Sequence, residues 1–202
     1  MEFRPLTAAD MEAFGRLTAF PWGDGQWDRC WCAISHYRTI KPEEWDRLCS
    51  GDGAENRAQI AGCLDRGFSP GTLAVDDDGT LLAWCSWGPA TEFPLFHQRA
   101  EQLGEHASRT AIIVCNTTSA DHKRQGLMRA LTAEVIRQAR EAGFVAIEAF
   151  PFPEDILAGP TGPGHSWMGY PSLYRAFGFV ALDVQSPARR GDHDRPVYRL
   201  EL

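Results

Sequence analysis

The residues best placed to do chemistry lie between positions 119 and 131, where basic side chains and one glycine stand at the expected start of a helix. The start of a helix offers about four unpaired N–H donors and a partial positive charge, and both suit a pyrophosphate. Gly126 lets the backbone approach a ligand without a Cβ in the way. The alternative is an ordinary basic helix start on the surface, since Lys and Arg are common there. The candidate phosphate-binding residues are Lys123, Arg124, Gln125, Gly126, Leu127, Met128 and Arg129.

The elements around this junction are strand, helix and strand. Residues 108–118 contain the apolar run 111–115, which is typical of a strand buried on both faces. A helix is expected from about 126 to 142, ending at Gly143, and a further strand at 144–150. This order indicates a βαβ unit, or a close variant in which the two strands are neighbours. No G-x-G-x-x-G or G-x-x-x-x-G-K-[ST] motif occurs, which disfavours Rossmann and Walker-type sites.

The remaining pattern predicts a mixed α/β domain. Upstream, we expect a strand at 3–6, a helix beginning with a capping box at 7–10, a helix at 54–66 and a hairpin of 72–75 with 80–87. Downstream, we expect a long Pro- and Gly-rich loop at 151–167, a helix from Pro171 to Gly178, and a final strand pair at 179–184 and 197–200. Four tryptophans lie between 21 and 53 without a clear period.

Two motifs resemble the GNAT superfamily of acyl-CoA-dependent N-acyltransferases. Residues 123–128, Lys-Arg-Gln-Gly-Leu-Met, are similar to its phosphate signature Arg/Gln-x-x-Gly-x-Gly/Ala, with Lys in place of Arg or Gln and Met in place of the last small residue. Residues 173–179, Leu-Tyr-Arg-Ala-Phe-Gly-Phe, look like its Leu-Tyr-x-x-x-Gly-Phe. The Cys-Trp-Cys at 30–32 and Glu-Ala-Phe-Pro at 148–151 resemble a bacterial subgroup whose substrates are mostly unassigned.

The resemblance implies a single domain over 1–202, elaborated at about 21–53, with a mostly antiparallel mixed sheet, flanking helices and strands that splay apart at the cofactor site. It implies that acetyl-CoA pairs with exposed backbone at Cys115, Thr117 and Thr118, and that Tyr174 donates a hydrogen bond to the departing sulfur. Glu148 is the candidate general base for the attacking amine, although a strand carboxylate is often only an edge or solvent-facing charge. A water chain is an alternative, and other titratable options are His36, His97, His122 and His165. The implied reaction is acetyl transfer by direct attack in a ternary complex, and the acceptor is an amine of a small molecule, a peptide or a protein. A homodimer is a family-level expectation.

Composition limits the alternatives. A net charge of −7 argues against non-specific nucleic-acid binding, and the absence of a run of about 18 apolar residues argues against a membrane span. The N-terminus shows no signal-peptide pattern, so we expect a cytoplasmic protein with reduced cysteines. Two other functions remain open: an acyl-CoA-binding regulatory domain without activity, and a zinc-dependent module. The zinc hypothesis rests on Cys30, Cys32, His36 and Cys49, whose spacing lacks a C-x2-C knuckle, and we expect no metal.

Overall fold

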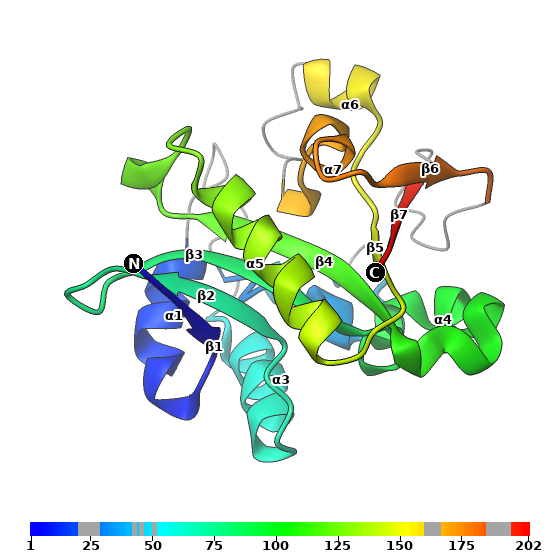
Figure 1. Ribbon diagram of the computed structural model, residues 1–202. Helices are drawn as coiled ribbons and strands as arrows, with labels where there is room; N and C mark the ends of the chain where they lie inside the picture. The colour runs from blue at the N-terminus through cyan, green and yellow to red at the C-terminus, as the bar shows by residue number, and fades with distance from the viewer. Residues whose placement is uncertain (20–28, 42–43, 45–46, 50–51, 160–166, 185–194) are drawn as a thin grey trace.

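The computed structural model describes residues 1–19, 29–41, 44, 47–49, 52–159, 167–184 and 195–202. Its centre is one seven-stranded sheet in the order β1-β2-β3-β4-β5-β7-β6 (Figure 1). Only β4 and β5 pair in parallel, and all other neighbours are antiparallel. The strands are β1 Glu2–Pro5, β2 Gly71–Val75, β3 Leu81–Pro89, β4 Thr110–Thr118, β5 Ala146–Ala149, β6 Val180–Leu182 and β7 Val197–Glu201.

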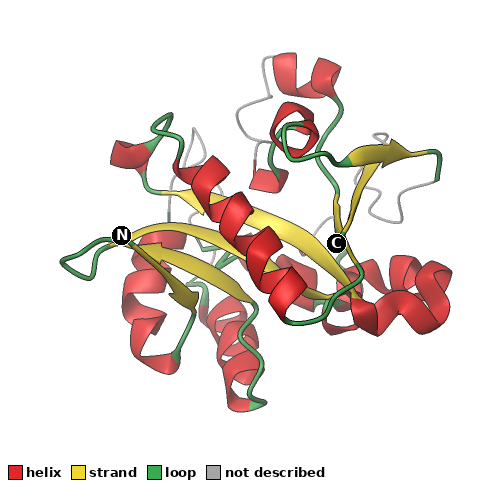
Figure 2. Cartoon of the chain, viewed as in Figure 1, coloured by secondary structure: helices red, strands yellow, loops and turns green. Residues whose placement is uncertain are grey.

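Helices cover both faces of this sheet (Figure 2). The face formed with α5 and α7 carries a core that includes Leu131, Val135 and Tyr174. The opposite face packs against α1 and α3 beside β1–β3, and against α4 beside β4, β5 and β7. The α-helices are α1 Met11–Thr18, α3 Ala54–Asp65, α4 His97–Leu103, α5 Leu127–Glu141, α6 Glu154–Ala158 and α7 Pro171–Arg175. Short 3₁₀ segments are Ala8–Asp10, Ile34–His36, Ala90–Glu92, Pro94–Phe96, Gly104–Arg109 and Ala120–His122.

Local sequence explains the elements next to the site. The helix α5 buries Leu127, Leu131 and Val135 at a four-residue spacing, so one stripe of the helix faces the sheet. Gly143 follows α5 with a φ of +79°, a conformation that favours glycine and ends the helix. The strand β4 is buried at every residue except Thr118, because helices cover it on both faces.

The predicted order of elements is confirmed, including the parallel pairing of two neighbouring strands around one helix. Two segments differ from the sequence prediction. The helix α6 lies inside the predicted loop 151–167, of which 160–166 fall outside the described residues. The helix α4 and the 3₁₀ segments around it were not predicted from the pattern. No helix in the described ranges is both long and apolar enough to cross a membrane.

Candidate active site

A β-bulge in β4 marks the centre of the site. Ser86 of β3 lies opposite Cys115, but Trp87 lies opposite Ile113, so Val114 has no partner in the register. Val114 and Cys115 therefore both belong to clusters on the face away from α5. Such an extra residue bends a strand and often occurs next to an active site.

The neighbouring strand separates from β4 at the bulge. Pairing with β5 runs from Thr110 opposite Ala146 to Ile113 opposite Ala149, and β4 then continues to Thr118 with no described residue paired on that side. The backbone of residues 114–118, which includes the predicted Cys115, Thr117 and Thr118, thus forms an open edge. Backbone polar groups on such an edge can pair with an extended ligand, as in β-augmentation.

The predicted phosphate-binding turn follows directly after this edge. Gly126 is the N-cap of α5 with a φ of +80°, and Arg124 also has a positive φ, +61°. In the described part of the chain, the amides of residues 125–129 donate to no protein acceptor, and the turn from Lys123 to Gly126 is exposed. A Cβ on Gly126 would have no described atom within 4 Å, so no described residue covers the turn there.

The two departures from the phosphate signature, Lys123 and Met128, fit this geometry, and Lys123 keeps a positive charge in the exposed turn. Met128 is half-buried and packs against the core cluster under α5, so its thioether has room beside the helix. Arg129 stays at the surface with its guanidinium 5.4 Å from the ring centroid of Phe177. The turn therefore combines unpaired amides with positive side chains, the combination that binds diphosphates.

Tyr174 reaches from α7 to β4. Its side chain is fully buried, and its Oη donates to the carbonyl oxygen of Met168 at 2.8 Å while accepting from Nδ2 of Asn116 at 3.2 Å. Burial raises the pKa of Tyr174 above its ordinary value near 10. Gly169, with a φ of +78°, makes room for the ring, because a Cβ there would lie 2.7 Å from Oη.

Glu148 lies in a buried ion network. Its Oε1 accepts from Nη2 of Arg99 at 2.6 Å and from Nη1 of Arg199 at 3.0 Å, and its Oε2 accepts from Nε of Arg99 at 2.8 Å. The network ties α4 to β5 and β7. To accept a proton from an amine, a carboxylate oxygen would have to give up a guanidinium partner. The base role stays a prediction, and this geometry favours a structural one.

The cysteine side of β4 faces the N-terminal segment. The Sγ of Cys115 lies 2.6 Å from the Sγ of Cys32, whose Sγ is 3.7 Å from Oγ1 of Thr117. The hydrogen bond with Cys32 and burial raise the pKa of Cys115 well above its usual value. Cys115 therefore remains a protonated thiol.

The four residues of the zinc hypothesis do not all meet at one point. Cys32 contacts Cys115, His36 contacts Cys63 through Nδ1 at 3.6 Å, and Cys30 and Cys49 share the cluster around Ile34 and Leu48. Among the described residues, no group of three or more His, Cys, Asp or Glu side chains could hold a metal ion.

The tryptophan-rich segment is described only in part. Trp22, Trp27 and Trp45 lie outside the described residues. Trp31 packs on Phe14 with ring centroids 6.0 Å apart. Trp167, at the end of the predicted loop, contacts the core clusters on both sides of the bulge.

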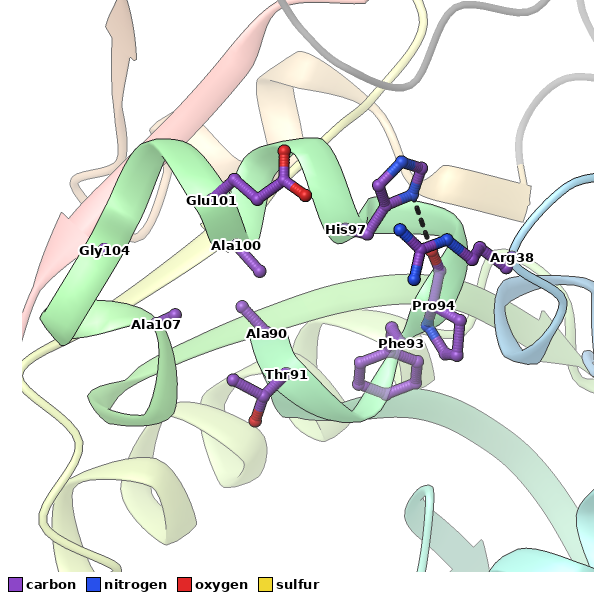
Figure 3. Close-up of a pocket in the computed structure, with 10 residues that line it drawn as sticks. All are labelled: Arg38, Ala90, Thr91, Phe93, Pro94, His97, Ala100, Glu101, Gly104 and Ala107. Atoms are coloured by element: carbon purple, nitrogen blue, oxygen red, sulfur yellow. Dashed lines mark hydrogen bonds between the residues drawn. The ribbon is translucent and has the colours of Figure 1, made fainter.

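A separate hollow of about 410 Å³ lies between α4 and the 3₁₀ segments around it (Figure 3). His97 and Arg38 stand at one end, with Nδ1 of His97 3.0 Å from the carbonyl oxygen of Pro94, and Glu101 lies farther along α4. Of the options for the general base, His97 lines it, whereas Tyr174, Glu148 and the predicted cofactor-binding residues do not. The hollow is therefore distinct from the open edge of β4.

Sequence reasoning missed three residues that shape the site. Asn116 contacts Tyr174, and its one signal is a polar amide at the end of an apolar run. Gly169 lies beneath the ring of Tyr174, and its signal is a glycine shortly before the helix that starts at Pro171. Arg99 pairs with Glu148 from a helix that the sequence pattern did not predict.

Solved structures of acetyltransferases share this fold at low sequence identity. Examples that cover 100% of this chain are a ribosomal-protein-alanine N-acetyltransferase from Brucella melitensis (18% identity, 100% of that chain, TM-score 0.58), yncA, a putative acetyltransferase from Salmonella typhimurium with acetyl-CoA (18%, 93%, 0.58), and the paia N-acetyltransferase from Thermoplasma acidophilum with coenzyme A (11%, 98%, 0.56).

Sequence comparison identifies the family. No curated protein matches this sequence. The family model described as "Acetyltransferase (GNAT) family" matches residues 31–155, more than half of the chain, and this range includes β4, the turn, α5 and β5. With the bulged strand, the open edge and the unpaired amides in place, the chain belongs to the GNAT acetyltransferase family.

Proposed function

We propose that this acetyltransferase transfers an acetyl group from acetyl-CoA to an amine by direct attack in a ternary complex. The observation that carries the proposal is the continuity of three features along one strand and turn. The open edge of residues 114–118 leads directly into the unpaired amides of residues 125–129, and Tyr174 reaches that edge through Asn116.

The residues present fit acetyl-CoA. The amides of residues 125–129, with Lys123, Arg124 and Arg129 around them, would hold the pyrophosphate, and the edge at Cys115, Thr117 and Thr118 would pair with the pantetheine arm. When bound, acetyl-CoA supplies a thioester that can acylate an amine. Because the edge binds through backbone, side-chain substitutions at 117 and 118 should have mild effects.

Tyr174 is proposed to stabilise the leaving thiolate by a hydrogen bond. Complete proton transfer from a phenol with a pKa near 10 to a thiolate with a pKa near 8.5 is uphill by about 2 kcal/mol. Burial raises the pKa of Tyr174, which makes complete transfer still less favourable. A donated hydrogen bond stabilises the developing charge without that cost. The proton of Oη must then turn away from the Met168 carbonyl.

Direct attack is supported over a covalent acyl-cysteine route. Cys115 lies at the bulge, but its thiol is held protonated by burial and by its contact with Cys32, and burial also raises the pKa of Cys85. Nucleophilic cysteines need a lowered pKa, since the thiolate is the reactive form. The acceptor class we propose is an amine of a small molecule or peptide, and the net charge of −7 suits a cationic one.

A thiol-release assay with acetyl-CoA and a panel of small-molecule and peptide amines tests the proposal. We expect coenzyme A release that depends on both the enzyme and one class of amine, with intersecting initial-rate patterns that indicate a ternary complex. Parallel lines would contradict direct attack. Calorimetric binding of coenzyme A without turnover on any amine would instead favour the regulatory domain.

A further inference from the structure

The side chain of Asn116 has one satisfied end and one unsatisfied end. Its Nδ2 donates to Oη of Tyr174 at 3.2 Å. Asn116 is only 5% exposed, and its Oδ1 is buried. This oxygen nevertheless accepts a hydrogen bond from no described residue. A buried acceptor without a partner costs about 1–3 kcal/mol, so such an atom calls for an explanation.

The location of Asn116 suggests what satisfies it. The residue lies two positions after the bulged Val114, on the part of β4 that has no β5 ladder. Cys115 and Thr117 on either side of it contact Cys32 on one face, so Asn116 projects to the other face, where Tyr174 lies. An amide oxygen can only accept, and therefore its missing partner is an N–H or O–H donor.

Tyr174 depends on the same residue for its position. Its hydroxyl makes two hydrogen bonds, one of them with Asn116 and the other with the backbone of Met168. The ring is confined from below by Gly169. Removing the amide of Asn116 would leave the Met168 carbonyl as the single hydrogen-bond partner of Oη among the described residues. The hydroxyl of Tyr174 would then be held by one hydrogen bond instead of two.

We propose that Asn116 is a positioning residue that joins bound substrate to Tyr174: its Oδ1 accepts a hydrogen bond from a substrate N–H while its Nδ2 holds the tyrosine hydroxyl beside the open edge. The inference rests on the proposed acetyl transfer. The N–H donor has two sources, a pantetheine amide of acetyl-CoA or the acceptor amine. Both offer the same chemistry to Oδ1.

The experiment compares Asn116→Leu with Thr110→Val. Leucine has a similar size and removes both hydrogen-bonding ends. Thr110 is a matched control because it lies on the same strand and is fully buried with an unpaired Oγ1, but it sits where β5 still pairs. We expect both variants to fold with thermal stability close to wild type, because each removes an unsatisfied buried atom.

Steady-state kinetics and coenzyme A calorimetry then show how Asn116 affects turnover and which N–H group donates to its Oδ1. We expect Asn116→Leu to lower kcat at least tenfold while Thr110→Val changes it less than twofold. A pantetheine donor predicts weaker coenzyme A binding by about five- to tenfold, the size expected for one hydrogen bond. An acceptor-amine donor predicts a similar rise in the KM of the amine with coenzyme A binding unchanged.

A double-mutant cycle tests the link to Tyr174. In the Tyr174→Phe background, Asn116→Leu should lower kcat no further, while its effect on binding should remain. Additive losses in kcat would overturn the positioning role, and unchanged kcat and binding in Asn116→Leu would overturn the whole inference. Failure of the proposed function is distinguishable, since the wild-type protein would then release no coenzyme A from acetyl-CoA with any amine, whether or not it binds coenzyme A.

Discussion

Replacing Gly169 with alanine should displace Tyr174. A Cβ at this position would lie 2.7 Å from Oη and 3.0 Å from Cε2 and Cζ, whereas ordinary contact begins at 3.4 Å. The ring must therefore move roughly 0.7 Å away from residue 169, because atoms in a close-packed interior cannot overlap. This shift weakens the hydrogen bonds of Oη to Met168 and Asn116, which are 2.8 and 3.2 Å long.

The expected magnitude combines backbone strain with the lost contacts. Alanine at a φ near +78° costs about 1–2 kcal/mol, and two weakened hydrogen bonds cost about 1 kcal/mol each. We expect Gly169→Ala to lose about 3–4 kcal/mol, or a melting temperature lower by about 10 °C. Turnover should fall by about 100-fold, since a misplacement of this size at a reacting group has that effect.

Gly143→Ala is the matched control for Gly169→Ala. Gly143 has a φ of +79°, but a Cβ there meets no described atom within 4 Å, so the variant carries the backbone strain alone. It should lose about 1–2 kcal/mol and keep wild-type turnover. Thermal denaturation and thiol-release kinetics on both variants provide the comparison. Equal losses of stability and turnover in the two variants would refute the claim that Gly169 positions the tyrosine.

Three further predictions concern single residues. Tyr174→Phe should lower kcat by at least tenfold with coenzyme A affinity unchanged, and an unchanged kcat would remove Tyr174 from the mechanism. Glu148→Gln leaves Arg99 and Arg199 without their buried anion. It should lower the free energy of unfolding in urea by about 3–5 kcal/mol and kcat by less than tenfold. A 100-fold loss of kcat at wild-type stability would instead identify Glu148 as the general base. Burial lowers the pKa of His36 to about 4 from an unfolded value of 6.5, so the unfolded chain binds more protons between these two pH values. The free energy of unfolding should therefore fall by about 3 kcal/mol as the pH drops from 6.5 to 4. The same pH dependence in a His36→Phe variant would show that His36 is not its cause.

The sequence predicted the elements that have strong local signals. The helix α5 was predicted from its apolar stripe and its glycine stop, and β4 from a continuous apolar run. The short helix α6 has five residues in a Pro- and Gly-rich stretch, too few for a recognisable period. The helix α4 depends on tertiary packing of Phe96 and on the buried Arg99–Glu148 pair, neither of which a single-sequence pattern contains.

The parts of the candidate site also differ in whether local sequence or tertiary contacts determine them. The phosphate turn is local in sequence, so Lys123 to Arg129 could be proposed from spacing and family resemblance. The bulge at Val114 depends on the register between two strands, and Asn116 meets Tyr174 across 58 positions of sequence. Glu148 was recognised as a strand carboxylate, but its two arginine partners come from α4 and β7.

Coenzyme A calorimetry on Gly126→Asp tests the central claim, that the amides at the start of α5 hold the pyrophosphate. Gly143→Asp is its control, because it adds the same charge at the same positive φ beyond the other end of the same helix, and both positions are open to solvent. We predict no measurable binding for Gly126→Asp and wild-type affinity for Gly143→Asp, since only the first places an anion against the diphosphate. Wild-type affinity in Gly126→Asp would contradict the account.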